Sequence, residues 1–341
     1  MKWARSVSML AVFACLAVPA LAAPAAPCRD NAALRYWMAF AEMENPPADS
    51  DVAKRLGAVA EGEAPWDEGL APILDRNRDA LATLHRGARL SFCDWGYEYE
   101  MLSAAPIANI ARSRTLARLN VLQGMRLLRA GRAAESVDAW LAGVRFSRDI
   151  AADGPWLAAL VAGRSVRAHL DVLSGAVRDA KLDAPLRARV AQEIAALPEA
   201  GFDWGVAARR ELEGTAAILA TLEHADDPLR ALEQDHQLIS SAKPDETAKK
   251  LGLRVAQLSD REAVRGALRR ARAFNDAVRP AVVAAMARPH AQSAGAVREA
   301  SDRIAQDPTV SMMSPSLARL NDARGDVVKA RAELLALVAG R

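Results

Sequence analysis

Four acidic side chains and two histidines gather in one short stretch of the chain that could do metal chemistry. The group consists of Glu223, His224, Asp226, Asp227, Asp235 and His236. Imidazole nitrogens and carboxylate oxygens suit zinc or manganese, and two histidines with one acid can form an open catalytic site. Eleven residues separate the two histidines, so we expect them on different elements, and Asp227 can cap a helix. The alternative interpretation is a solvated junction between helices, and we predict no metal or other cofactor.

A second group of side chains that could take part in catalysis lies near Cys93 in the sequence. This thiol could be a nucleophile if His85 took its proton and Asp94 oriented the imidazole ring. The acids Asp94, Glu98 and Glu100 could instead serve as the paired carboxylates of a glycosidase. No serine-hydrolase, zinc-protease, phosphate-loop or dinucleotide motif occurs in the sequence. A cell-envelope hydrolase with its site near Cys93-Asp94-Glu98 or in the 223–236 cluster therefore stays the alternative function.

Residues 1–22 predict a signal peptide. Lys2 and Arg5 give a positive start, an apolar run covers 7–18, and Ala20-Leu21-Ala22 places small residues where signal peptidase cleaves. The apolar run is too short to span a bilayer. We expect cleavage near Ala22 and a periplasmic or extracellular protein; the alternative is a chain tethered to the membrane by its uncleaved N-terminus.

Export changes how the cysteines are interpreted. Cys15 would leave with the signal peptide, which leaves Cys28 and Cys93. Two cysteines in an oxidising compartment are a candidate disulfide, which would stabilise the fold by roughly 4 kcal/mol in the chain-entropy model. The alternative is a buried free thiol at Cys93 and a loosely held Cys28.

Arginines are concentrated between residues 101 and 134, where there are six and no acid. At about 100° per residue, Arg114, Arg118, Arg129 and Arg132 fall within about 60° of one another on a helix. Such a stripe could bind an anionic partner through bidentate guanidinium contacts. The alternative is that these arginines meet acids on adjacent helices or are simply solvated.

Composition favours helices throughout. Alanine, leucine and arginine dominate, and aromatic residues make up only 5% of the chain. We predict an all-α fold of antiparallel helix hairpins in a solenoid-like or irregular array, with the aromatic loop 91–100 filling a junction between hairpins. The expected helices cover 31–44, 51–60, 72–87, 106–130, 133–151, 155–178, 183–197, 203–224, 259–280 and two segments starting at 227 and 315.

Local signals mark several boundaries. Ser259-Asp260-Arg261-Glu262 has the spacing of a capping box, and Pro280 should kink or end the helix that follows it. The stretch 240–246 is the best linker candidate. We expect a helical domain over 23–242 and a C-terminal helical region over 245–341, which either stands apart or belongs to the same domain.

One helix pair resembles a tetratricopeptide repeat unit. The resemblance covers 117–150 and rests on Gly124, Leu127, Gly131-Arg132, Ser136, Trp140 and Gly143. It departs from the family pattern at Asn120 and Gln123, where the family has Trp and Leu. The resemblance implies two antiparallel helices packed through small residues, in an array with a concave binding surface.

Charge and hydropathy restrict the partners. The chain has a net charge of +3, and loss of Lys2 and Arg5 with the signal peptide lowers it to +1, which does not indicate a nucleic-acid-binding protein. No second apolar stretch approaches the length of a membrane span. We therefore predict an exported, non-enzymatic scaffold or binding protein that engages a peptide or a cell-envelope component.

Overall fold

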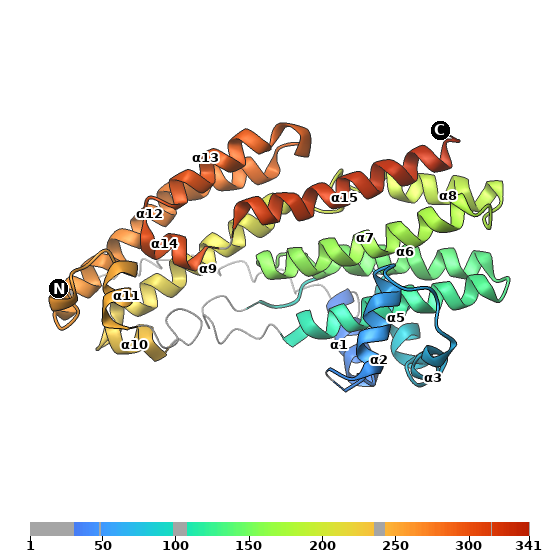
Figure 1. Cartoon of the computed structure of the whole chain (residues 1–341), viewed down its shortest axis with the longest axis horizontal. Helices are drawn as coiled ribbons and strands as arrows, with labels where there is room; N and C mark the ends of the chain where they lie inside the picture. Colours follow the sequence, from blue (N-terminus) through green and yellow to red (C-terminus); the bar gives the residue numbers. More distant parts are fainter. Residues whose placement is uncertain (1–30, 48, 98–107, 235–242, 315, 341) are drawn as a thin grey trace, which may run out of the picture.

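The computed structural model describes residues 31–47, 49–97, 108–234, 243–314 and 316–340, and these residues form an all-helical array (Figure 1). The predicted all-α fold is confirmed. In the described residues, β structure is limited to an isolated parallel bridge between Asn31 and Phe92. The predicted signal peptide lies outside the described residues.

The first helices form a compact group that packs against the long helices that follow them in the chain. They are α1 (Ala32–Glu42), α2 (Asp51–Ala60), the 3-10 helix η2 (Glu68–Leu70), α3 (Ala71–Arg76) and α4 (Arg78–Gly87). The single helix expected over 72–87 is wrong, because the chain breaks at Asn77. The Asn77 side chain is buried there, accepts a hydrogen bond from the Glu44 amide at 2.9 Å and donates one to the Ile73 carbonyl at 2.8 Å. These contacts fix the break between α3 and α4.

The aromatic loop fills a junction between helices, as its composition predicts. Trp95 is 8% exposed, and its ring stacks on Phe40 at a centroid distance of 6.1 Å and on Tyr36 at 5.7 Å. Its indole N–H donates to the Asp149 carbonyl at 2.6 Å. The loop therefore ties α1 to the end of the helix that carries Asp149.

Three long helices form the centre of the array: α5 (Ala108–Arg129), α6 (Ala133–Ile150) and α7 (Trp156–Arg178). Short turns join them, so consecutive helices run antiparallel. Gly124 lies against Trp140, where a Cβ would be 2.1 Å from the indole nitrogen. The Ser136 hydroxyl donates to the Gly124 carbonyl at 2.8 Å. Gly124 and Ser136, two of the small residues behind the tetratricopeptide resemblance, thus lie at the α5–α6 contact, while membership of that family stays a prediction.

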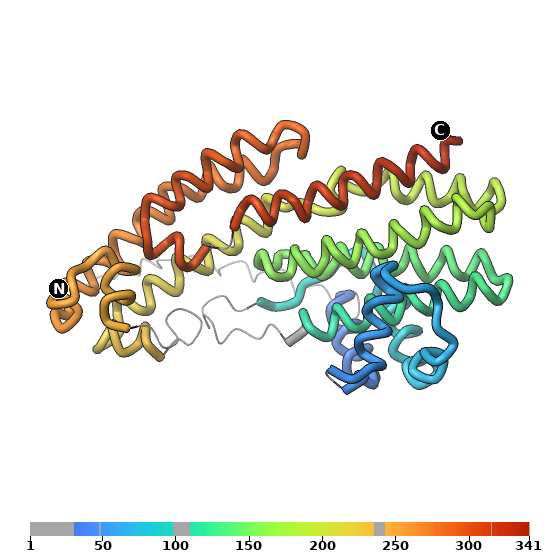
Figure 2. The backbone as a smooth tube through the Cα atoms, viewed as in Figure 1, coloured from blue at the N-terminus to red at the C-terminus, as the bar shows by residue number. Residues whose placement is uncertain are grey.

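The remaining helices extend the array along α7 and α9 (Figure 2). They are α8 (Ala184–Ala195), α9 (Trp204–His224), α10 (Pro228–Gln234), α11 (Pro244–Lys250), η4 (Val255–Gln257), α12 (Arg261–Ala287), η5 (His290–Gln292), α13 (Ala294–Ile304), α14 (Pro308–Met313) and α15 (Leu317–Val338). Helix α12 packs along α9, and α15 packs along α7 and α8. Val327 of α15 is buried in one apolar cluster with Val166 and Leu170 of α7.

The predicted capping box of α12 is wrong, and of the two outcomes expected at Pro280 the end of the helix is wrong. The N-cap is Asp260 rather than Ser259, and its carboxylate accepts hydrogen bonds from the backbone amides of the next turn at 3.0 and 3.3 Å. The Glu262 side chain bonds Arg265 instead of closing a capping box. Pro280 lies inside α12, which continues to Ala287. A proline costs one backbone hydrogen bond, and burial of the neighbouring apolar residues against α9 offsets that loss.

The structure describes only part of the linker expected over 240–246. Helix α11 begins at Pro244, so the last residues of the expected linker are helical. Residues 240–242 lie outside the described part of the chain. Within the described residues, no helix combines the length and the apolar character needed to cross a bilayer.

Candidate functional site

A groove lies between α5 and α7, next to the end of α2. Its cavity has a volume of about 240 Å³. The walls are largely apolar and consist of Ala117, Val121, Leu157, Leu160, Val161 and Ala168. The polar lining consists of Glu61, Arg114, Arg118, Arg164, Ser165 and His169. We call these twelve residues the arginine groove.

Helical spacing explains why these side chains share one groove. Arg114 and Arg118 are four residues apart on α5, so they lie on one face. On α7, Leu157, Leu160 and Arg164 follow at intervals of three and four. The groove is thus lined by two rigid helices, which fixes the direction of the cationic groups relative to the apolar wall.

Glu61 is the single carboxylate among the described residues that line the groove. It follows the last residue of α2, and its backbone amide donates to the Gly57 carbonyl at 2.9 Å. Its carboxylate pairs with Arg118 and lies 3.5 Å from Arg114. Partial burial on its own would raise the pKa of Glu61, but the hydrogen bond and charge of Arg118 and the charge of Arg114 lower it below its usual value. Glu61 is therefore ionised at neutral pH.

Arg118 is the better fixed of the two paired arginines. Its side chain is 21% exposed, against 48% for Arg114. The guanidinium lies over Gly57 of α2, where a Cβ would be 3.4 Å from it. A glycine at this position lets α2 approach the guanidinium closely, and the helix holds it in place.

Arg164 differs from these two arginines. It is exposed at the groove, and in the described part of the chain it forms no ion pair. The lining holds three guanidinium groups and one carboxylate, so the groove carries a net charge of +2 when His169 is neutral. The electric field of this positive charge is stronger in a concave, partly apolar site, because low-dielectric walls screen it less than water does. The arrangement favours an anionic ligand with an apolar part.

A buried hydrogen-bond chain lies beneath the groove. His169 is fully buried, and its Nδ1–H donates to the Ser165 carbonyl at 2.7 Å. Its Nε2 then accepts from the Asn120 amide at 3.1 Å, while the Asn120 carbonyl oxygen accepts from Nε2–H of His85 at 2.7 Å. Burial lowers the pKa of His169 to about 4, so the imidazole is neutral. With both ring nitrogens occupied, His169 positions the groove floor and has no free nitrogen for acid–base chemistry.

The structure divides the predicted arginine stripe. Arg114 and Arg118 line the groove, whereas Arg129 and Arg132 lie near the other end of α5. Arg129 is 3.5 Å from Glu68, and Arg132 is 2.5 Å from Glu135 in the first turn of α6. All four arginines therefore have a carboxylate partner, which is the arrangement expected under the alternative interpretation. Anion binding by the whole stripe stays a prediction.

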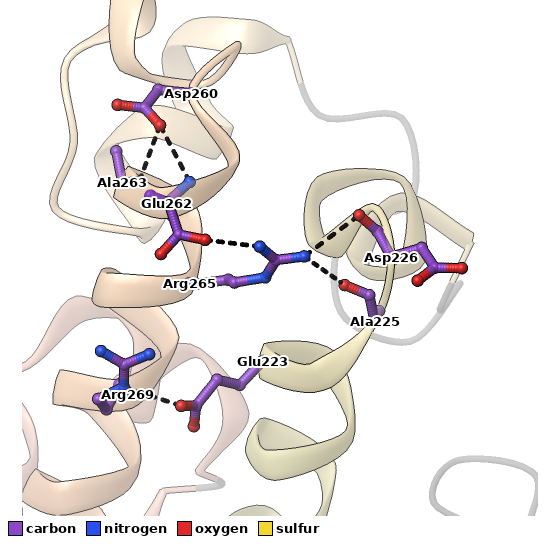
Figure 3. A network of polar contacts seen from close by, with 8 residues as sticks. All are labelled: Glu223, Ala225, Asp226, Asp260, Glu262, Ala263, Arg265 and Arg269. Atoms are coloured by element: carbon purple, nitrogen blue, oxygen red, sulfur yellow. Dashed lines mark hydrogen bonds and ion pairs between the residues drawn. The ribbon is translucent and has the colours of Figure 1, made fainter.

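Glu223 of the proposed metal cluster is bound by Arg269, as Figure 3 shows, and also by Arg272. Its carboxylate accepts from Arg269 at 2.9 Å and lies 2.9 Å from Arg272. The hydrogen bond from Arg269, with the charges of both arginines, lowers the pKa of Glu223. Next to it, Arg265 donates to the carbonyls of Ala225 and Asp226 at 3.1 and 3.3 Å. These contacts join α9 to α12.

Two other described members of that cluster, Asp227 and His224, make local hydrogen bonds at helix ends. The Asp227 carboxylate accepts from the Arg230 amide at 3.1 Å and so caps α10. His224 donates from Nδ1 to the Ala220 carbonyl at 2.6 Å. Asp235 and His236 lie outside the described residues, and among those described no group of three potential ligands could hold a metal ion. The described part of the cluster forms the helix junction of the alternative interpretation.

The second predicted chemical site has a poorly activated thiol. Cys93 is half-buried, and its Sγ lies 3.7 Å from the Asp149 carbonyl. Burial, followed by the negative charges of Asp149 and Asp94, raises the pKa of the Cys93 thiol. Asp94 accepts from the Gly96 amide at 2.9 Å instead of orienting His85, which bonds Asn120. A thiolate nucleophile is therefore disfavoured, while Glu98 and Glu100 lie outside the described residues.

The predicted disulfide stays a prediction. Cys93 is the only cysteine among the described residues, and Cys28 lies outside them. The hydrogen bond from Asn31 to the Asp94 carbonyl, at 2.9 Å, places the start of α1 beside the Cys93 loop.

Sequence reasoning does not identify Glu61, Arg164 or His169 as groove residues. Each lies on a different turn or helix from Arg114 and Arg118, and no local motif connects them. The sequence feature that could have pointed to this site is the helical spacing of Leu157, Leu160 and Arg164. This spacing places the three side chains on one amphipathic face of α7. That spacing does not reveal which helix this face meets.

Comparisons with models of known protein families, with curated proteins and with solved structures find no match to this chain. The support for a function therefore comes from the geometry of the groove.

Proposed function

We propose that this protein is an exported helical binding protein that holds a peptide segment of a partner in the arginine groove. One observation carries the proposal: an apolar wall lies beside three guanidinium groups and one carboxylate, which pairs with two of them. An apolar side chain of the partner would be buried against α7, and a carboxylate would pair with the arginines. Guanidinium groups form charge-assisted, bidentate bonds with carboxylates, which supply both energy and direction.

The rigid lining supports binding. Leu157 and Arg164 lie on α7, and Arg118 is held against Gly57. A site built on packed helices loses little conformational entropy when it binds, so more of the contact energy contributes to affinity. The hydrolase alternative has no comparable support, because Cys93 has a raised thiol pKa and Glu223 is bound by arginines.

Site-specific photo-cross-linking tests the proposal. A photo-reactive amino acid replaces Leu157, which lines the groove and is 47% exposed. The matched control carries the same group at Val255, which is 46% exposed and lies outside the groove. We expect cross-linked peptide from an envelope extract at position 157 and little at 255, with the yield at 157 reduced by Arg118→Gln. Equal yields at the two positions, or no effect of Arg118→Gln, would contradict the proposal.

Export has its own test. We expect natively produced protein to begin after Ala22, and its mass spectrum reports the N-terminus directly. The same material, denatured without reductant, should show no free thiol if Cys28 and Cys93 are paired. A mass that includes Met1 would contradict export with cleavage, and two free thiols would contradict the pairing.

A further inference from the structure

A second cavity joins the arginine groove on its far side. It has a volume of about 530 Å³ and shares Glu61, Arg164 and Ala168 with the groove. It lies between α7 and α15, and most of its other residues are charged. These are Glu63, Arg167, Asp171, Arg319, Asp322 and Asp326. We call this cavity the charged compartment.

Glu61 lies where the two cavities meet. Its carboxylate occupies the guanidinium groups of Arg118 and Arg114, which any anion entering the groove would use. The Glu61 side chain is 42% exposed, so its carboxylate can turn to solvent while α2 stays in place. The next residue, Gly62, has a φ of 75°, and a Cβ added there would meet no atom within 4 Å. The chain immediately beyond α2 is therefore not packed against the groove.

We propose that the groove recognises the free C-terminus of a peptide, whose terminal carboxylate replaces Glu61 on Arg114 and Arg118. This inference rests on the proposed function and specifies its ligand. The side chain of the last residue lies against the apolar wall of α7, and the preceding backbone runs past Arg164 into the charged compartment. No covalent step is involved, because one carboxylate replaces another on the same two cations.

The size of the groove favours a chain terminus over an acidic side chain. A cavity of about 240 Å³ presents guanidinium and apolar groups close together. A C-terminal apolar residue carries its side chain and its carboxylate on the same Cα, so both groups fit one small site. In an internal acidic residue the carboxylate is the side chain, and the apolar contact must come from a different residue.

The charged compartment favours a peptide over an acyl chain. A fatty acid also joins a carboxylate to an apolar group, and a short one would fit the groove. A longer acyl chain would have to lie against Arg319, Asp322 and Asp326, which offer it no apolar cover. A peptide backbone brings amide and carbonyl groups that can hydrogen-bond to these side chains.

Calorimetric titration with defined probes tests the inference on the full mature chain. The probes are a hexapeptide with a C-terminal leucine carboxylate, the same peptide with a C-terminal amide, and octanoate. We expect the free acid to bind at least about tenfold more tightly than the amide, because only the acid forms charge-assisted bonds. We expect octanoate to bind more weakly than the free-acid peptide.

Two variants remove the same charge, one inside the groove and one away from both cavities. Glu61→Gln removes the internal competitor, and we expect the free acid to bind about tenfold more tightly. Glu299→Gln is the matched control, because Glu299 is exposed on α13 and lines neither the groove nor the charged compartment. We expect it to change the affinity by less than about twofold. Equal effects of the two variants would overturn the competitor role.

The outcomes separate this inference from the proposed function. If acid and amide bind equally and both cross-link at position 157, the groove binds peptides and terminal recognition is wrong. If octanoate binds as tightly as the free-acid peptide, the ligand is an acyl carboxylate and the peptide assignment is overturned. If no probe binds and position 157 gives no cross-link, both proposals fail. A circular dichroism spectrum unchanged from the native protein is required of each variant.

Discussion

Asn120 joins two histidines through the middle of the helical array. Its amide also donates to the Ala139 carbonyl at 2.8 Å, so the side chain connects α4, α5, α6 and α7. Gly143 makes room for this contact, because a Cβ there would be 2.3 Å from the Asn120 amide and 2.0 Å from the His169 ring. A buried polar network of this kind stabilises a fold only while every member has a partner.

Replacing Asn120 by leucine keeps the volume and removes the bonds. His169 then loses its donor and His85 its acceptor, and a buried polar group without a partner costs about 1–3 kcal/mol. We expect Asn120→Leu to lower the free energy of unfolding by about that amount. Urea unfolding measures it, with Thr115→Ala at a partly exposed position of α5 as control, expected within about 0.5 kcal/mol of the native protein. Equal stability of Asn120→Leu and the control would show that the hydrogen-bond chain contributes nothing.

His169 predicts a pH dependence of stability. Its pKa is about 4 in the folded protein, against an ordinary value of 6.5. Between these values the unfolded chain binds a proton that the folded protein does not, so the free energy of unfolding falls as pH falls from 6.5 to 4. The shift corresponds to a loss of about 3 kcal/mol across this range.

Unfolding of the native protein and of His169→Gln, measured between pH 4 and 7, isolates this group. Glutamine can accept the Asn120 hydrogen bond and does not titrate, so we expect the variant to lose stability less steeply on acidification. Parallel curves for the two proteins would contradict the neutral, buried state of His169.

Capping residues predict where a helix begins. Interior residues predict less well whether a helix continues without a break. The helix expected over 51–60 is α2 with the same bounds, because Ser50 accepts a hydrogen bond from the Ala53 amide at 3.2 Å. The residues around Asn77 do not predict the break between α3 and α4, because the break depends on a contact with Glu44, more than thirty residues earlier in the chain. Pro280 does not end α12, because packing along α9 outweighs the local cost of a proline.

The α5–α6 contact depends on a glycine. A Cβ at Gly124 would lie 2.1 Å from the Trp140 indole nitrogen, and this buried ring is held by a 3.0 Å hydrogen bond to the Val121 carbonyl. We expect Gly124→Ala to destabilise the protein by about 1–3 kcal/mol through overpacking. Thermal unfolding checks this.

Gly175 on α7 is the matched control for that substitution. Nothing lies within 4 Å of a Cβ added there, and the residue is also inside a helix. Alanine has the higher helix propensity, so Gly175→Ala should stabilise the protein by about 0.5–1 kcal/mol. If both substitutions raise the melting temperature, the close contact at Gly124 does not constrain the helices.

For the whole molecule, the structure places helices from distant parts of the chain in the same apolar clusters. Val327 and Leu334 of α15 are buried with Val166 and Leu170 of α7. An ion pair of 2.8 Å between Arg167 and Asp326 adds a polar contact between the same helices. We therefore expect residues 31–340 to unfold as one cooperative unit.

The tryptophans make cooperative unfolding measurable. All seven lie at or before Trp204, whereas Ile304 lies on α13 and is 5% exposed. We expect Ile304→Ala to lower the free energy of unfolding seen by tryptophan fluorescence by about 2–4 kcal/mol. The same loss should appear in circular dichroism at the same urea concentration. A fluorescence transition that stays at the native midpoint would show that the C-terminal helices unfold separately.

The fold class can be predicted from sequence, and the groove cannot. Arg114 and Arg118 are recognised because helical spacing puts them on one face. Glu61 and Arg164 reach them only through the packing of α2 and α7 against α5, and periodicity does not say which helices are neighbours. The charge of the groove depends on all four residues, so its net value requires the structure.

A double-mutant cycle on peptide binding at the Glu61–Arg118 pair tests carboxylate recognition in the groove. The dissociation constant of the leucine-terminated peptide is measured for the native protein, Glu61→Gln, Arg118→Gln and the double variant. We predict that Glu61→Gln tightens binding about tenfold in the native protein and less than about twofold when Arg118 is already replaced. The same gain in both backgrounds would mean that Glu61 does not compete for Arg118, and would contradict carboxylate recognition in this groove.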